Sequence, residues 1–492
     1  IYKNAWLNFY DKPILYFPKF FHPDPTVKRQ SGFLIPSVVS STTSGSSLKI
    51  PYFHAISQNK DFTLSPRIFL NNDILLQNEY RQIEKNLNHI SDFSLKKLDH
   101  SSKSHFFSNT KISLDTSFEN SDIEINLEKT SNDTYLKSEN IKTALSDNQS
   151  VLNSYFNYSV NNDNLDFFAE VAAYEDLSKI KNSDKYQFIL PSFSLSKLID
   201  LTKGNINFTL KGLNQKRDTN ITESYLINDL EFNSDLNISK KGITNNFHLL
   251  FKNSSKKGTN STDYSNDFES DNFITSIFTT SLPMKKVHDK FKSNLVPKAS
   301  LRLSPFESEN NSKLDRQLNT TNLFSNNRLG LSESLEGGQS ITLGIDYDIL
   351  DEQDKNFFSS SLGQIFRDND DEKLPLSTTM DNQRSDIIGK IQFTPNENLS
   401  INYNFSADND LDTINYNFLE TKFKVNNFIA SFEFLEEDKN IGSKSYFQND
   451  IKYKFGANSS LNYNTRRNRK TDLTEYYNLI YEYKNDCLVA AI

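Results

Sequence analysis

The sequence predicts an all-β protein, a large antiparallel transmembrane β-barrel, and three observations support this prediction. Apolar and polar residues alternate along many short segments. The connections between these segments alternate between short turns and longer loops. The 492 residues include 39 Phe and 22 Tyr, which favour pleated strands and supply the aromatic girdles of membrane barrels.

Alternation is strictest in a set of segments spread along the chain. One of them, 399–405, places four apolar side chains on one face: Leu399, Ile401, Tyr403 and Phe405. The same period of two is found at 123–128, 206–210, 341–349, 428–434 and 451–455. Because successive side chains of a strand point to opposite faces, each segment is predicted to be a strand with one apolar and one polar face.

The connections toward the C-terminus follow a regular order. Short turns are predicted at 394–398, 425–427, 456–458 and 484–486. Between them lie other connections at 406–410, 436–443 and 466–472. This spacing leaves room for strands of about 10–12 residues, close to the length that crosses a membrane. Short turns on one side and longer loops on the other are typical of an outer-membrane barrel.

Alternation alone does not decide whether the apolar face packs in a soluble core or faces lipid. Strand-like segments fill most of the 492 residues, which is too long for one sandwich, and the opposite face suits a wet lumen. A soluble β-repeat protein or adhesin is the alternative, although we find no repeat of about 20–50 residues. The polar stretches 253–270 and 305–328 are predicted to be loops that project from the barrel.

Composition and motifs disfavour several classes of function. The formal charge is −8, from 55 Lys and Arg against 63 Asp and Glu, with no sustained basic face, so nucleic acid is not an expected partner. The seven His show no zinc-type spacing, and the acidic run 368–373 lacks the glycine of a calcium loop. We therefore expect no metal, no cofactor, no catalytic residue and no enzymatic activity.

A specific motif lies in the two stretches 26–37 and 48–69, TVKRQSGFLIPS and LKIPYFHAISQNKDFTLSPRIF. It resembles the start of the barrel in the LptD family of lipopolysaccharide-assembly outer-membrane proteins. The matching positions are Lys28, Arg29, Ser31, Gly32, Phe33, Leu34, Pro36, Pro51, Tyr52, Asn59, Asp61, Thr63, Pro66 and Arg67. The segments 296–305, 328–349 and 361–367 support the resemblance.

The resemblance implies a barrel of about 26 strands, of which about 24 are expected here, preceded by the end of a periplasmic β-jellyroll. Residues 1–28 are then the last jellyroll strands and a hinge, and 29–492 are a C-terminally truncated barrel. The implied function is insertion of lipopolysaccharide into the outer leaflet of the outer membrane. The implied partners are lipopolysaccharide, a plug lipoprotein of the LptE type and periplasmic Lpt bridge proteins bound through the absent N-terminal domain. A general porin or uptake channel for small polar solutes is the alternative.

The resemblance also gives roles to three residues. Pro36 and Pro51 match prolines of the first two barrel strands, where missing hydrogen-bond donors weaken the seam between first and last strands into a lateral gate. A proline that merely starts or ends a strand is the other interpretation of Pro36. Cys487 matches a family cysteine that bonds to the periplasmic domain. Asp486 stands where the family often has a second Cys, so the pairing of Cys487 is left open.

Overall fold

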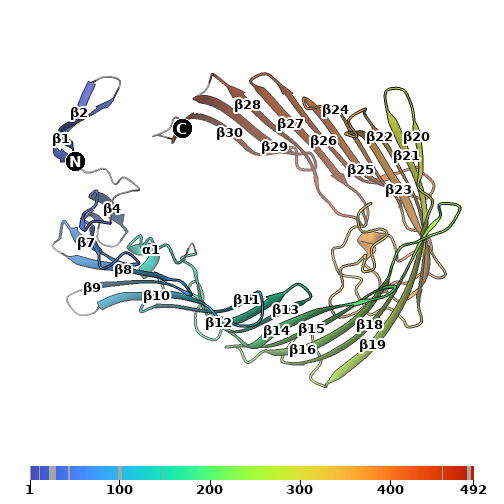
Figure 1. Cartoon of the computed structure of the whole chain (residues 1–492), viewed down its shortest axis with the longest axis horizontal. Coiled ribbons are helices and arrows are strands. Elements are labelled where there is room, and N and C mark those ends of the chain that lie inside the picture. Colours follow the sequence, from blue (N-terminus) through green and yellow to red (C-terminus); the bar gives the residue numbers. More distant parts are fainter. Residues whose placement is uncertain are drawn as a thin grey trace. The chain divides into compact units, whose positions relative to one another are not determined.

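The computed structural model of the chain describes residues 2–9, 12–20, 29–42, 45–71, 73–97, 102–146, 148–456, 458–484 and 489–492. Regular structure in these residues is almost entirely β-strand (Figure 1). Strands β1 and β2 form a two-stranded sheet, and the other 29 described strands belong to a second sheet. The ladders in both are antiparallel. This confirms the predicted all-β class, and a sheet of this size is the kind that large β-barrels contain.

The chain divides into two compact units, which we describe separately. The first unit comprises Ile1–Lys197, Leu210–Leu226 and Lys256–Glu269. The second unit comprises Leu198–Thr209, Ile227–Ser255 and Ser270–Ile492. Strands β14, β15, β16, β18 and β19 contribute residues to both units. The predicted division into residues 1–28 and 29–492 follows a different criterion and stays a prediction.

The first unit contains thirteen strands and one short helix among its described residues. They are β1 (Tyr2–Phe9), β2 (Lys12–Phe20), β3 (Gly32–Phe33), β4 (Ser37–Ser41), β5 (Gly45–Lys49), β6 (Tyr52–Ala55), β7 (Lys60–Phe69), β8 (Ile74–Glu84), β9 (Leu87–Lys97), β10 (Ser102–Ser113), β11 (Asn120–Thr130), α1 (Tyr135–Ser138), β12 (Val151–Asn162) and β13 (Leu165–Asp176). The strands shared between the units are β14 (Tyr186–Leu201), β15 (Gly204–Arg217), β16 (Thr222–Ser234), β18 (Thr244–Thr259) and β19 (Glu269–Ser281).

The second unit holds the remaining described elements. They are β17 (Asn237–Ile238), β20 (Met284–Val287), β21 (Lys292–Ser304), β22 (Gly338–Leu350), β23 (Asn356–Arg367), the 3-10 helix η1 (Leu376–Thr378), β24 (Ile387–Asn396), β25 (Leu399–Ala407), β26 (Ile414–Val425), β27 (Phe428–Glu437), β28 (Ser445–Lys454), β29 (Ser459–Asn468), β30 (Leu473–Lys484) and β31 (Val489–Ala491).

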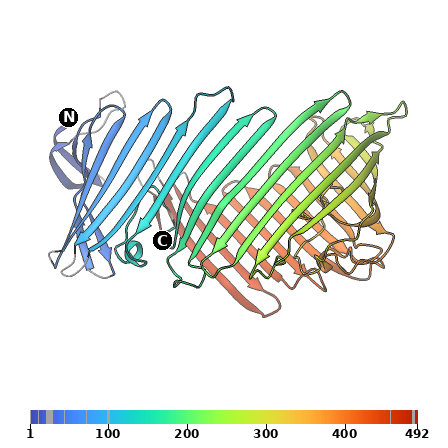
Figure 2. The same cartoon turned by 90° about the horizontal axis from the view of Figure 1, so that it is seen from below.

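Hairpins join strands that are consecutive in the chain, as Figure 2 shows for the long tilted strands. In the second unit, Val425 pairs with Phe428 across a two-residue turn, where Asn426 has a φ of 50°. Asn tolerates this left-handed conformation, which such tight turns require. The predicted turns at 394–398 and 425–427 and the strands predicted by alternation are confirmed, whereas 456–458 and 484–486 include residues outside the described part of the chain.

Burial in the first unit is inverted relative to a soluble protein. On β9 and β10, the apolar Phe93, Leu95 and Phe106 are 39%, 41% and 45% exposed. The polar Ser94 and His105, which lie on the opposite face of the same strands, are at most 1% exposed. Apolar side chains usually occupy the interior of a soluble protein. In this sheet the apolar face is instead the solvent-exposed one.

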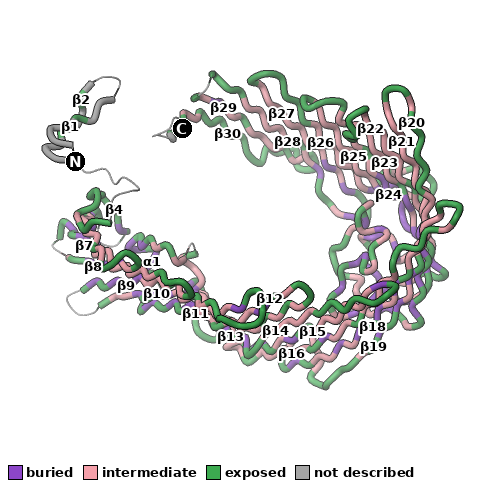
Figure 3. Tube along the Cα trace, viewed as in Figure 1, coloured by how far each residue is buried: buried purple, intermediate pink, exposed green. Residues whose placement is uncertain are grey.

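The second unit has the same inversion. Ile341 and Leu343 of β22 are 47% and 48% exposed, whereas Ser340 and Thr342, on the opposite face of the strand, are each 3% exposed. Figure 3 shows that many strand positions are intermediate or exposed, with buried positions interspersed among them. The polar face is therefore the covered one in this part of the sheet, and something within the chain must cover it.

Two predicted loops need correction. The stretch 253–270 is in part strand, because β18 continues to Thr259 and β19 begins at Glu269. The stretch 305–328 does not project from the sheet: Leu318, Leu323 and Arg328 are buried. Leu318 and Leu323 join an apolar cluster that includes Ile365 of β23 and Ile388 of β24, whereas Leu314 is exposed.

Candidate functional site

Two prolines lie where the first two strands of the large sheet are interrupted. Pro36 lies between β3 and β4, and Pro51 lies between β5 and β6. The pairs Phe33↔Tyr52 and Ser37↔Lys49 flank the interruption. Three residues of the first strand, 34–36, therefore face two residues of the second, 50–51. An extra residue on one strand is a bulge, which bends the strand and disrupts its ladder.

Few backbone hydrogen bonds cross the interruption. The Leu34 N–H donates to the Pro51 carbonyl at 2.8 Å across the hairpin, whereas the Ile50 N–H donates at 3.0 Å to the Pro66 carbonyl of β7, outside the hairpin. Proline has no N–H of its own to add to these bonds. Beyond them, the hairpin depends on two short ladders, β3 with β6 and β4 with β5.

A polar cavity of about 350 Å³ opens beside Pro51. Leu34 and Pro51 line it from the interrupted strands, and Lys49, Glu79 and Asp92 line it from β5, β8 and β9. The weakest part of the hairpin is thus adjacent to a space that accepts polar groups.

The polar residues of the predicted motif hold the start of β3 to β7. The Arg29 Nη1 atom lies 2.6 Å from Asp61 Oδ2, and Arg81 Nε of β8 lies 2.8 Å from Asp61 Oδ1. The Ser31 hydroxyl accepts a hydrogen bond from the Ala55 N–H at 2.9 Å. Asp61 itself is 2% exposed, so the two guanidinium groups compensate a carboxylate that burial would otherwise disfavour.

The remaining motif residues have structural positions. Gly32 and Phe33 form β3, and the exposed Phe33 ring lies 5.0 Å from that of Tyr52. Asn59 lies in the β6–β7 turn, where its side-chain oxygen accepts a hydrogen bond from Ser57. Pro66 lies within β7, opposite Leu76 of β8. Lys28 and Cys487 lie outside the described residues, so their predicted roles are not addressed by the structure.

Arg67 is the motif residue with the most extensive contacts. It is 2% exposed, its Nε donates to the Ser47 hydroxyl at 3.2 Å, and its Nη1 donates to the Glu139 carbonyl at 2.5 Å. Glu139 belongs to the connection between β11 and β12, residues 131–150, which we call the first cover segment. Arg67 therefore ties β5 and β7 to a segment some seventy residues later in the chain.

The first cover segment packs on the polar face of β7–β10. The Glu139 carboxylate accepts a hydrogen bond from Lys96 of β9 at 2.8 Å, and both side chains are 1% exposed. The Tyr135 hydroxyl lies 2.8 Å from the Ser94 hydroxyl. The Ser138 carbonyl accepts from the Thr42 N–H, just after β4, at 2.8 Å. An apolar cluster completes the contact: Phe69, Leu75, Phe107, Tyr135, Leu136, Ile141, Leu152 and Leu177.

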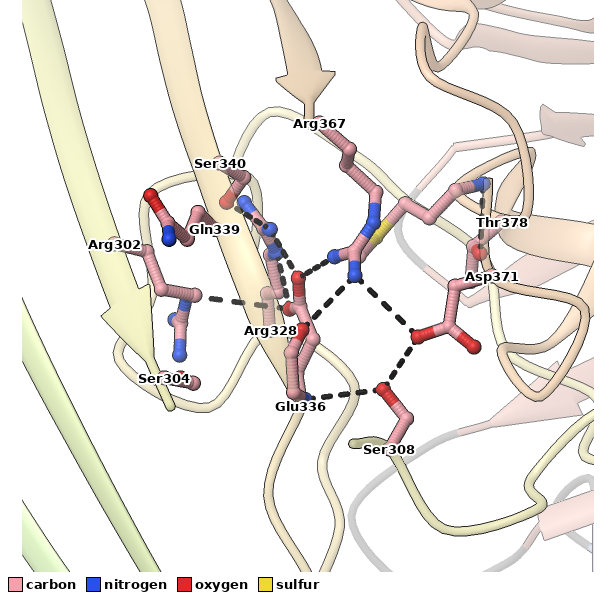
Figure 4. A network of polar contacts seen from close by, with 12 residues as sticks. Arg302, Ser304, Ser308, Arg328, Glu336, Gln339, Ser340, Arg367, Asp371 and Thr378 are labelled. Atoms are coloured by element: carbon pink, nitrogen blue, oxygen red, sulfur yellow. Dashed lines mark hydrogen bonds and ion pairs between the residues drawn. The ribbon is translucent and has the colours of Figure 1, made fainter. Parts of the chain in front are cut away.

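A second covered site, in the second unit, centres on Glu336 (Figure 4). Arg328 Nε donates to Glu336 Oε2 at 2.6 Å, and Arg367 Nη1 of β23 donates to Oε1 at 2.5 Å. Arg302 Nε of β21 lies 3.9 Å from Oε2. Glu336 and Arg328 belong to the connection 305–337, which we call the second cover segment. One carboxylate thus joins this segment to two strands.

Electrostatics at Glu336 are strong because the group is buried. Burial raises the pKa of its carboxyl, but the positive charges of Arg328, Arg302 and Arg367 outweigh burial and hold the pKa at about 2. The next residue, Gly337, is crowded: a Cβ there would lie 2.5 Å from the Phe306 carbonyl oxygen. Gly337 therefore has a packing role beside Glu336.

Sequence reasoning did not identify this arginine–glutamate cluster. Arg302, Arg328, Glu336 and Arg367 lie in three different elements, and single charged residues in polar stretches look like solvated loop positions. The available signal is the resemblance to the LptD family, because the three supporting segments 296–305, 328–349 and 361–367 contain all four residues.

The described part of the chain contains neither a membrane-spanning helix nor a cluster of metal ligands. No helix in it has the length and apolar character needed to cross a membrane. No group of three or more His, Cys, Asp or Glu in it is placed to hold a metal ion.

Comparisons with known proteins point to one family. A family model described as LPS transport system D, LptD, matches residues 101–466. The LPS-assembly protein LptD of Chromobacterium violaceum is 37% identical over 81 residues, 16% of this chain and 10% of that protein. The LPS-assembly protein LptD of Polaromonas sp. is 40% identical over 81 residues, with the same shares. The matched segments thus span about a tenth of these relatives.

A solved structure was also matched. The ferric preacinetobactin receptor BauA of Acinetobacter baumannii has a TM-score of 0.32 and 7% identity to this chain, covering 94% of this chain and 78% of that chain. A similarity this low carries no argument about function.

Proposed function

The chain belongs to the LptD family, and from this premise we propose that it inserts lipopolysaccharide into the outer leaflet of the outer membrane. In this proposal it is a transport protein and not an enzyme. The route runs along the polar face of the sheet and leaves sideways through a gate at the first strands. The observation that carries the gate is the interruption of both strands of the first hairpin at Pro36 and Pro51.

The inverted burial supports a membrane location. Apolar side chains such as Leu343 and Phe106 are 48% and 45% exposed on strands whose polar face is covered. Exposed apolar surface of this extent would drive association in water, whereas hydrocarbon solvates it. The outer face of a transmembrane barrel has this character.

The chemistry of lipopolysaccharide requires a sideways exit. Its sugars need a polar path, and its acyl chains need hydrocarbon. A ladder hydrogen bond contributes about 0.5–1.5 kcal/mol net in water and more where lipid is the alternative solvent. A first strand that is held to its hairpin partner by fewer hydrogen bonds moves away from the last strand at lower cost, so acyl chains can pass between these strands while sugars stay at the polar cavity beside Pro51.

Family membership also supports the proposed partners. We propose a plug lipoprotein of the LptE type on the polar face and periplasmic bridge proteins that deliver lipopolysaccharide. The polar face is only partly covered by the chain itself: Asn402 of β25 and Lys452 of β28 are half-buried. A plug on this face would contact such residues.

Site-specific photo-crosslinking in cells tests the route. A crosslinker at Leu34, beside the cavity, is expected to trap lipopolysaccharide. The matched control is Leu343 of β22, which is similarly exposed at 48% against 46% for Leu34 but lies far from the prolines in the sequence. Equal trapping at both positions, or none at Leu34, would contradict the gate. Solute conductance in vesicles without any trapping would favour a general porin instead.

A further inference from the structure

A second pocket lies at the end of β7 and β8 that carries the β6–β7 turn. It has a volume of about 260 Å³ and is lined by Arg29, Gln58, Asn59, Asp61, Arg81 and Ile83. It is separate from the cavity beside Pro51, with which it shares no lining residue. None of its lining residues lies at the interruption of the first hairpin, 34–36 and 50–51.

The arginines of this pocket keep most of their donors available. The side chains of Arg29 and Arg81 are 49% and 42% exposed, although Asp61 between them is buried. A guanidinium has five N–H donors. Within the described residues, Arg29 hydrogen-bonds through Nη1 alone and Arg81 through Nε alone, both to Asp61. The other donors are left for a ligand.

Asp61 holds the guanidinium groups of Arg29 and Arg81 at the same pocket. It accepts Arg29 on Oδ2 and Arg81 on Oδ1, so one buried carboxylate fixes two arginines from different parts of the chain. Glu79 is the competing acid, with Oε1 at 3.5 Å from Arg81 Nε. The pocket lining itself has two positive charges against one negative charge and adds the neutral amides of Gln58 and Asn59. Such a lining favours an anion with several acceptor oxygens.

An apolar side chain completes the pocket. Ile83 is 57% exposed and lies on the same face of β8 as Arg81, two residues away. A guanidinium group can donate two parallel hydrogen bonds to two oxygens of a phosphate. The exposed isoleucine beside it can contact a hydrocarbon chain. The combination fits a phosphate group carried on an amphiphile better than a free ion.

We propose that Arg29 and Arg81 form a binding site for a phosphomonoester of a glycolipid. This inference rests on the proposed function and deepens it, because it assigns the phosphate groups of lipopolysaccharide to a place next to the first strand. Arg29 lies three residues before the first residue of β3, so a phosphate held here is close to the start of the interrupted hairpin. Asp61 acts as a positioning residue that aims both arginines.

The test measures binding of two lipids to the purified full chain in detergent. The probes are diphosphoryl lipid A and the same lipid A after removal of its phosphates. For the double variant Arg29→Gln with Arg81→Gln, diphosphoryl lipid A is expected to bind about tenfold more weakly or worse. Binding of the dephosphorylated lipid is expected to stay as in the wild type. Inorganic phosphate as competitor separates a free-ion site from a lipid site: it is expected to displace lipid A weakly.

Two controls keep the result interpretable. Removing both arginines leaves Asp61 buried and unpaired, so a triple variant that adds Asp61→Asn retains a foldable site and is expected to show the same loss. Arg467 is 54% exposed and pairs with one carboxylate, Asp472, at 2.6 Å, and Arg467→Gln is expected to bind both lipids normally.

The outcomes separate this inference from the proposed function. Wild-type binding of diphosphoryl lipid A by a folded triple variant would overturn the phosphate site and leave the transport proposal standing. Failure of the wild-type chain to bind either lipid would contradict both. Stronger binding of inorganic phosphate than of lipid A would also overturn the site as a lipid site.

Discussion

Two regions of the molecule cover the polar face of their strands in a similar way but differ in whether the strand ladder beside the cover is continuous. In each, a long connection folds over the polar face of its strands, with an apolar cluster and one buried carboxylate: Glu139 in the first cover segment and Glu336 in the second. Under the second segment, β21 and β22 form an unbroken ladder from Lys292↔Leu350 to Ser304↔Gly338. Beside the first segment, both strands of the first hairpin are interrupted.

The difference shows that a proline does not by itself break a strand. Pro297 lies inside β21 and pairs with Ile345, yet β21 continues to Ser304. Its carbonyl accepts from the Leu282 N–H, on the side where β19 ends and β20 has not yet begun. The N–H that Pro297 lacks would therefore face Leu282, outside the ladder between β21 and β22. The Pro51 carbonyl instead accepts from Leu34 of the hairpin partner, so the missing donor falls within the hairpin's own ladder.

The largest expected effect on stability is that of removing the Glu336 carboxylate of the second cover segment. Glu336→Gln leaves three buried arginines without their shared anion, and breaking a buried pair costs about 3–5 kcal/mol. We expect the free energy of unfolding of the protein in detergent to fall by that amount, as measured by urea titration. Glu307→Gln, at an exposed acid paired with Lys373, is the control and is expected to change little. Equal stability of both variants would contradict the role of Glu336.

The contribution of Glu336 to the free energy of unfolding is expected to depend on pH. The folded pKa of Glu336 is about 2, against an ordinary value of 4.5, so the unfolded chain binds the proton more readily. This stability is fully present above pH 4.5 and is lost as the pH falls toward 2. At about 1.4 kcal/mol per pKa unit, the contribution is about 3 kcal/mol. Urea midpoints measured across that range should fall more steeply for the wild type than for Glu336→Gln, and parallel curves would argue against it.

A smaller effect is expected in the first cover segment. Glu139→Gln removes the 2.8 Å ion pair with Lys96, whose ammonium retains Asp73 at 4.0 Å and the Phe69 ring at 4.5 Å. We expect a loss of about 2 kcal/mol and faster hydrogen exchange at Thr42 and in residues 131–146. Exchange in residues 305–337 should stay unchanged. Unaltered exchange at Thr42 would show that this segment does not hold the end of β4.

The smallest change in stability is expected at the prolines, where function is the more sensitive readout. Pro36→Ala with Pro51→Ala returns up to two donors, each worth about 0.5–1.5 kcal/mol. The protein should become slightly more stable and deliver lipopolysaccharide more slowly to the cell surface. Pro297→Ala is the matched control, because Pro297 lies in β21, whose ladder with β22 is already unbroken. Slower delivery in the control as well would remove the distinction between the two regions.

The sequence by itself determined the strands, their faces and the order of short and long connections. A period of two needs only local side-chain geometry, so the apolar face of 399–405 and the turn at 425–427 were readable from the chain. The motif from Arg29 to Arg67 also marked the first strands, and with them the two prolines.

Only the tertiary structure decided what covers the polar face. Residues 305–328 contain a few leucines among many polar residues and have the composition of a solvated loop, yet Leu323 and Arg328 are buried. Glu139 meets Lys96, and Glu336 meets Arg367, across connections whose composition does not specify where they fold. Local patterns cannot encode such pairs, because a buried carboxylate is stable only where distant cations are brought to it.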